Sequence, residues 1–233
     1  MKVTKHGNNV YKLTRFRLMN CYLVEDGDSL ILVDANLPNL ADAILAAAAN
    51  IGKPITKIVL THGHQDHVGS LEALVEKLPD VEVYASKRTV AYWNGDFSLP
   101  AGDTGSVRTG NFPQMSVKPT RKVADGEMVG SLLVIDSPGH TREHISWFDT
   151  RDKTLFAGDS WQTAGGLAVM GDVRWLFPFP GMITWSKAAS LKSAERALAL
   201  SPQRLCCGHG QVLENALPQM QAAYARAKGK SGS

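Results

Sequence analysis

Short apolar runs separated by turn residues fill the first third of the chain, a pattern typical of buried β-strands. The runs cover residues 10–13, 21–24 and 30–33, and the turn sequence Asp26, Gly27, Asp28 separates the last two. This spacing predicts an antiparallel meander.

Helical and strand-like patterns alternate afterwards. Helices are predicted at 39–50, 68–78 and 184–200, and strands at 58–60, 81–84, 131–136, 144–148, 154–156 and 204–207. A closing helix is predicted at 218–228, because Pro218 suits a first helical turn. Strands and helices in both halves predict two sheets packed face to face between helical layers.

Two segments lack such patterns. Residues 94–120 are rich in Gly, Pro, Asp, Ser and Thr, which predicts a long surface loop and a candidate lid. Residues 229–233 are small and polar, which predicts a flexible tail after a single catalytic domain spanning residues 1–228.

Composition adds little about partners. The chain has 233 residues, 44% of them hydrophobic, and its net charge of +3 is spread without a basic block, so neither nucleic acid nor a membrane is expected to bind it. The polar N-terminus and the lack of a long apolar segment predict a soluble, unexported protein. Three cysteines, two of them adjacent, form a poor disulfide framework and favour the cytoplasm.

The densest chemical signal follows the apolar run 58–60, where His62, His64, Asp66 and His67 fall within six residues. Side chains two apart in an extended segment point the same way, so His62 and His64 can hold one ion. The turn into the next helix can bring Asp66 and His67 toward a second. Crowded imidazoles would repel one another if protonated, whereas a bound cation favours their neutral form.

Three more candidate ligands, His140, Asp159 and His209, each follow a glycine after a strand-like run. Strand ends of a sandwich can converge on one rim, and the two oxygens of Asp159 can bridge two cations. Each residue alone is more often an ordinary turn residue. Together with the first cluster they indicate a two-metal site.

The chain resembles the metallo-β-lactamase-fold hydrolases. Their marks are His-x-His-x-Asp-His, a later Gly-His-Thr, a Gly-Asp after a strand and a terminal Gly-His, and all four occur here in that order between residues 9 and 210. The resemblance implies an α/β fold, a four-layer αββα sandwich of two mixed sheets flanked by helices, with the metals at one edge. It also implies a division of the ligands: His62, His64 and His140 for the first metal, Asp66, His67 and His209 for the second, and Asp159 between them.

Two divalent cations in such a site share a hydroxide that attacks a carbonyl or phosphoryl centre. Asp66 is the best candidate to orient this nucleophile or to transfer a proton. Histidine-rich ligation favours zinc, although iron or manganese accepts the same ligands. His144 follows His140 by four, and we expect it behind the ligands, hydrogen-bonded to one of them, or else as an ordinary strand residue.

Differences between this chain and subgroups of the family limit the reactions that we expect. Two-zinc β-lactamases generally lack an acid at the position of Asp159. Glyoxalase II shares all the ligands. It binds glutathione with a C-terminal helical region, however, whereas only residues 210–233 follow His209 here. Lactonases typically have a tyrosine where this chain has Gln162, whose amide can still donate to a substrate carbonyl.

The window 161–185 is unusually apolar and includes Trp161, Trp175, Trp185, Phe177 and Phe179. These side chains either belong to the core or to an interface, such as that of a homodimer, or they form a wall of the metal site.

The leading hypothesis is a dinuclear hydrolase that attacks a lactone or thioester in a small to medium, partly apolar substrate. Two alternatives are an iron-dependent thiol or persulfide dioxygenase, which would use mainly His62, His140 and Asp159, and a β-lactam or phosphodiester hydrolase.

Overall fold

The first half of the chain forms a seven-stranded sheet in sequence order. A computed structural model describes residues 1–98 and 110–231. The strands are β1 (Lys2–His6), β2 (Val10–Arg15), β3 (Met19–Asp26), β4 (Ser29–Val33), β5 (Ile55–Val59), β6 (Glu82–Ser86) and β7 (Arg121–Val123). Strands β1 to β4 pair antiparallel, and β4 to β7 pair in parallel. The predicted meander is therefore present, with one further strand, β1, at its edge.

The second half forms a six-stranded sheet. Its order is β15 (Leu213–Glu214), β14 (Arg204–Cys207), β11 (Thr154–Gly158), β10 (Ile145–Asp149), β9 (Leu132–Asp136) and β8 (Met128–Val129). Only β11 and β14 pair in parallel. A separate ribbon joins β12 (Trp161–Gln162) to β13 (Ala168–Val169).

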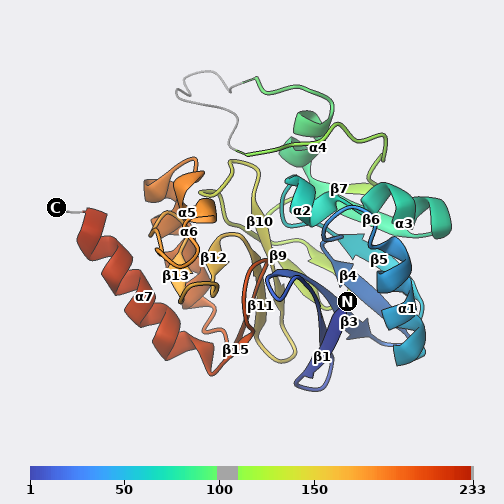
Figure 1. Cartoon of the computed structure of the whole chain (residues 1–233), viewed down its shortest axis with the longest axis horizontal. Coiled ribbons are helices and arrows are strands. Elements are labelled where there is room, and N and C mark those ends of the chain that lie inside the picture. Colours follow the sequence, from blue (N-terminus) through green and yellow to red (C-terminus); the bar gives the residue numbers. More distant parts are fainter. Residues whose placement is uncertain (99–109, 232–233) are drawn as a thin grey trace.

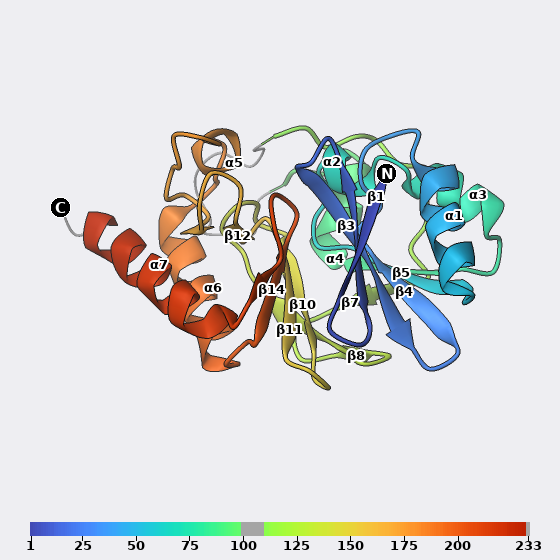
Figure 2. The ribbon, with the colours of Figure 1, turned by 60° about the horizontal axis from the view of Figure 1, so that its bottom comes forward.

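Helices flank the two sheets, on their outer faces and at one edge. They are α1 (Ala41–Ile51), α2 (Gln65–Val68), α3 (Leu71–Lys77), α4 (Lys87–Trp93), α5 (Phe179–Met182), α6 (Lys187–Ala199) and α7 (Ala216–Ser231). Figure 2 shows α1 and α3 outside the first sheet and α6 and α7 outside the second. The four-layer αββα sandwich of two mixed sheets is confirmed.

Successive side chains along a strand of the first sheet point alternately to the helices outside it and to the second sheet. In β3 and β4, Leu23 and Leu32 pack toward the helices of the first layer, whereas Val24 and Ile31 pack toward the second sheet. Because both faces are buried, these strands appear in the sequence as continuous apolar runs.

The predicted helix at 68–78 is wrong in its bounds, since α2 and α3 replace it. The break lies at Gly69, whose N–H donates to the carbonyl of Asn36 and where a Cβ would lie 2.4 Å from Pro38. The bond to Asn36 replaces the helical bond to the carbonyl of Gln65, so the helix is interrupted here, and glycine permits the close contact with Pro38.

Two other helices also differ from prediction. Helix α6 begins at Lys187 rather than 184, because the Ser186 side chain accepts a hydrogen bond from the Ala189 N–H and caps the helix. Helix α7 runs from Ala216 to Ser231, so Gly229 and Lys230 are helical rather than part of a tail.

The predicted loop at 94–120 includes residues 99–109, which lie outside the described residues. In its described part, Phe112 is buried and its ring lies 4.7 Å from that of His64. The lid stays a prediction. No helix in residues 1–98 and 110–231 is both long and apolar enough to cross a membrane.

Candidate metal centre

Seven predicted ligands meet at one edge of the sandwich. They come from the segment after β5, from α2, from the β9–β10 loop and from the ends of β11 and β14: His62, His64, Asp66, His67, His140, Asp159 and His209. Six of them are buried and Asp66 is partly exposed. The fold thus brings together side chains separated by up to 147 positions, from His62 to His209.

The first group contains three histidines. His62 Nε2 and His140 Nε2 each lie 3.1 Å from the same atom, Nδ1 of His64. One ring nitrogen cannot satisfy two partners well, because it offers either one N–H or one lone pair. Three converging nitrogens at this spacing are suited to hold one cation.

The second group contains Asp66, His67 and His209. His209 Nε2 lies 3.4 Å from the Asp66 carboxylate, and His67 Nε2 lies 4.0 Å from it. Asp159 lies between the groups, with Oδ1 3.4 Å from His67 Nε2 and Oδ2 3.6 Å from His140 Nε2. A carboxylate in this position faces both sets of ligand atoms.

Buried polar atoms test whether these residues fit a cation. His67 Nε2 and Asp159 Oδ1 are buried and make no hydrogen bond among the described residues. Leaving such atoms unsatisfied costs about 1–3 kcal/mol each. The ligand atoms of each group lie within 4.8 Å of one another. The donor set therefore fits divalent metal ions.

The two groups differ in protonation. Burial and the neighbouring histidines lower the pKa of His62 and of His140 well below the ordinary value, so both rings are neutral. Burial opposes protonation of His67 and His209 as well, but the carboxylates of Asp159 and Asp66 raise the pKa of both. The neighbouring carboxylates therefore favour the protonated forms of His67 and His209.

Asp34 belongs to the site although it was not predicted from the sequence. Its Oδ2 lies 2.7 Å from Nδ1 of His67, and it accepts hydrogen bonds from the N–H and hydroxyl of Thr61. This contact leaves Nε2 of His67 directed at the ligand group. The available signal was an acid directly after β4, whose carboxyl end lies beside that of the parallel strand β5.

His144 lies behind the ligands. Its Nε2 accepts a hydrogen bond from the Asp159 N–H at 3.0 Å, its Nδ1 lies 2.8 Å from Ser137 Oγ, and its ring stacks on His62. Burial lowers the pKa of His144 to about 3, so the ring is neutral. Both nitrogens are engaged, which leaves neither for a metal.

Gln162 and Trp161 do not reach the site. The Gln162 amide donates to the carbonyls of Ala164 and Phe177, so the predicted hydrogen bond to a substrate carbonyl has no free donor. Trp161 is fully buried in the core between the second sheet and its helices. Side chains alternate along β12, and neighbouring elements occupy both of its faces.

The rest of the apolar window divides between two environments. Phe177, Phe179, Pro180 and Ile183 line a cavity of about 260 Å³ together with five of the ligands and Met19. Trp175 lies outside this cavity with 91% of its surface exposed. Cys206 and Cys207 are buried.

The family described as the Metallo-beta-lactamase superfamily matches residues 15–209. The chain is 40% identical to the uncharacterized protein YobT of Bacillus subtilis (strain 168), over 98% of this chain and 99% of that protein. It is 31% identical to the probable metallo-hydrolase YflN of the same organism, over 83% and 81%. A hydroxyacylglutathione hydrolase of Rhodopseudomonas palustris (strain BisB18) is 30% identical, over 83% of this chain but 63% of that protein.

Solved structures show the same architecture. TTHA1623, determined in a di-iron-bound form, matches with a TM-score of 0.63 and 26% identity, over 88% of this chain and 94% of that chain. The metallo-beta-lactamase DIM-1 matches with a TM-score of 0.72 over 98% and 97%, at 16% identity, which is evidence of fold alone.

Proposed function

Because this chain belongs to the metallo-β-lactamase superfamily, we propose that it holds two zinc ions and hydrolyses an ester-like bond, a lactone or thioester, in a small, partly apolar substrate. Membership makes the chain a metal-dependent hydrolase. The bond, the substrate and the number and identity of the metals are the proposal.

The lining of the cavity at the ligands supports the choice of substrate. The cavity above the ligands has a polar floor, formed by residues such as Asp66 and Asp159, and an apolar wall of Phe177, Phe179 and Ile183. A second cavity of about 260 Å³ shares His64, Asp66 and Ile183 with the first. This arrangement suits a carbonyl at the metals and an acyl or other apolar group against the wall.

The protein's own residues position the reacting groups. Asp34 orients His67, and His144 holds the main chain of Asp159, so the ligand atoms keep their directions. When bound to these ligands, divalent cations would supply a nucleophile by lowering the pKa of a water molecule and would polarise the scissile carbonyl.

Asp66 is the acid–base group of the proposal. It is the most exposed of the seven ligands, its carboxylate lines both cavities, and its Oδ2 lies 3.4 Å from His209 Nε2. A carboxylate at the boundary between metals and substrate can accept a proton from the nucleophile and return it to the leaving group.

The thioester part of the proposal is supported by the relative named hydroxyacylglutathione hydrolase. This chain covers only 63% of that protein, so glutathione recognition is not part of the proposal. The recognition element proposed here is the apolar wall.

The test is a hydrolysis screen on zinc-, manganese- and iron-loaded protein, with bound metal quantified in each sample. Lactones and thioesters of increasing acyl length should turn over, with kcat/KM rising with length, and β-lactams and phosphodiesters should not. Asp66→Asn should reduce kcat by about 10²–10⁴-fold, whereas Asp28→Asn, at an exposed turn, should not. Turnover of phosphodiesters alone, or oxygen uptake with a single iron, would overturn the proposal.

A further inference from the structure

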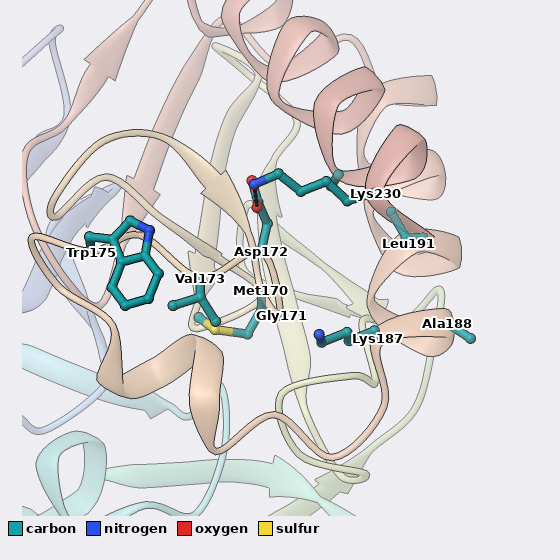
Figure 3. Close-up of a pocket in the computed structure, with 10 residues that line it drawn as sticks. Met170, Gly171, Asp172, Val173, Trp175, Lys187, Ala188, Leu191 and Lys230 are labelled. Atoms are coloured by element: carbon teal, nitrogen blue, oxygen red, sulfur yellow. Dashed lines mark hydrogen bonds and ion pairs between the residues drawn. The ribbon is translucent and has the colours of Figure 1, made fainter. Parts of the chain in front are cut away.

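A further pocket, distinct from the two cavities at the ligands, lies on the far side of the apolar segment. Its volume is about 580 Å³, and residues of α6, α7 and the segment after β13 line it (Figure 3). Pockets that hold small organic molecules measure about 300–1,000 Å³. This pocket therefore has room for one such molecule.

The lining combines apolar surface with positive charge. Met170, Val173, Leu191 and Ala227 supply apolar surface, and Lys187 and Lys230 approach from α6 and α7 (Figure 3). An apolar lining with a few placed charges is typical of sites for amphipathic ligands.

The acidic group in the pocket, Asp172, is already neutralised. Its Oδ1 accepts a hydrogen bond from Lys230 Nζ at 2.7 Å, and its Oδ2 accepts one from Arg226 Nε at 3.0 Å. Lys187 makes no ion pair within residues 1–98 and 110–231. Among the described residues that line the pocket, two lysines, Lys187 and Lys230, stand against one carboxylate, that of Asp172, so this lining carries an excess of positive charge.

An exposed aromatic side chain borders the pocket. Trp175 is 91% exposed, and Leu176 beside it is 88% exposed. Large apolar side chains exposed next to a cavity often mark a binding surface, because their burial by a ligand is favourable. An indole can cover a flat or aliphatic group through its face.

The pocket is separate from the metal cavity but shares a wall with it. Val173 and Trp175 line the pocket, and Phe177 and Phe179 of the same segment line the metal cavity. The Phe177 N–H donates to the carbonyl of Arg174, and this turn separates the residues that line the pocket from those that line the metal cavity.

We propose that this pocket binds a small organic anion whose carboxylate or sulfonate lies near Lys187 and whose aromatic or aliphatic part packs on Met170, Val173 and Trp175. Charge complementarity selects the anion, and the apolar lining selects the amphipathic body. The site does not depend on the reaction at the metals.

The test uses 8-anilinonaphthalene-1-sulfonate, a fluorescent amphipathic anion, titrated into the metal-loaded full chain. Its uncharged counterpart, N-phenyl-1-naphthylamine, separates the charge from the apolar body. Lys187→Glu should weaken binding of the anion by about tenfold through reversed charge and leave the neutral compound within about twofold. The matched control is Lys192→Glu, on an exposed position of the same helix outside the pocket, which should change neither.

Two further variants locate the dye. Trp175→Ala should weaken both compounds, and Phe179→Ala, in the wall of the metal cavity, should leave the anion bound as before; circular dichroism checks the fold of each variant. Equal effects of Lys187→Glu and Lys192→Glu, or loss of dye in Phe179→Ala alone, would overturn the proposal. So would a dimer that Trp175→Ala dissociates in sedimentation, because a second copy would then occupy this face.

Discussion

Individual side chains at the metal centre depend on partners that touch no substrate. Asp34 holds the Nδ1 of His67, and Ser137 lies against the Nδ1 of His144, whose Nε2 holds the main chain of Asp159. Each contact sets which nitrogen faces the ligands. Metal affinity is therefore expected to depend on these partners as well as on the ligands.

Removal of the Asp34 carboxylate tests this dependence. Asp34→Ala should weaken metal binding by about 10–100-fold, because His67 loses the hydrogen bond that orients it. Competition with a chromophoric chelator measures the affinity. Asp28→Ala, at an exposed turn, is the control; equal affinities in both variants would show that Asp34 does not orient a ligand.

The raised pKa values of His67 and His209 predict that metal affinity depends on pH. Since carboxylates raise the pKa of His67 and of His209, protons compete with a cation for both rings. Metal binding should release about one to two protons per chain at pH 7, and affinity should fall as the pH is lowered. Calorimetry in two buffers of different ionisation enthalpy measures the release, and identical heats in both would contradict it.

Strand ends are the elements that place the ligands. Helix α2 starts directly after His64, and Asp159 and His209 follow β11 and β14, which are parallel and therefore end at the same edge. The turn after β14 passes so close to the ligands that only glycine fits. A Cβ at Gly208 would lie 2.5 Å from both Asp159 Oδ1 and His67 Cε1.

Gly208→Ala should consequently reduce the metal bound per chain while the fold persists, because the added carbon displaces Asp159 and His67 rather than core residues. Metal analysis after dialysis, together with circular dichroism, measures both effects. Gly229→Ala, where a Cβ meets nothing within 4 Å, should bind metal like the parent chain. Full occupancy in Gly208→Ala would show that the site tolerates this displacement.

Across the whole molecule, the metal centre joins the two halves of the sandwich. His62 to His67 follow the first sheet, whereas His140, Asp159 and His209 follow strands of the second. A cation held by residues of both sets would link the sheets at one edge, in addition to the apolar core between them. Binding to the folded state alone stabilises that state by mass action.

Chelation should accordingly lower the Tm. Metal at 100 times its Kd contributes about 2.7 kcal/mol, which corresponds to about 5–11 °C for a chain of this size. Thermal unfolding with and without chelator measures the difference, and added zinc should restore it. The double variant His62→Ala, His67→Ala should show no response; a response of the same size in that variant would place the effect elsewhere.

The sequence alone predicted the layers from its continuous apolar runs, and it predicted the seven candidate ligands from one dense local motif together with the family resemblance of three later turn residues. Tertiary structure decided the rest. The position of Asp34 directly after an apolar run was a signal in the sequence, but its contact with His67 depends on the parallel pairing of β4 and β5. The resemblance to lactonases suggested a substrate contact for Gln162, but the carbonyls of Ala164 and Phe177 accept hydrogen bonds from its amide. Side-chain partners depend on what packs on each face, and that is decided by residues far away in the chain.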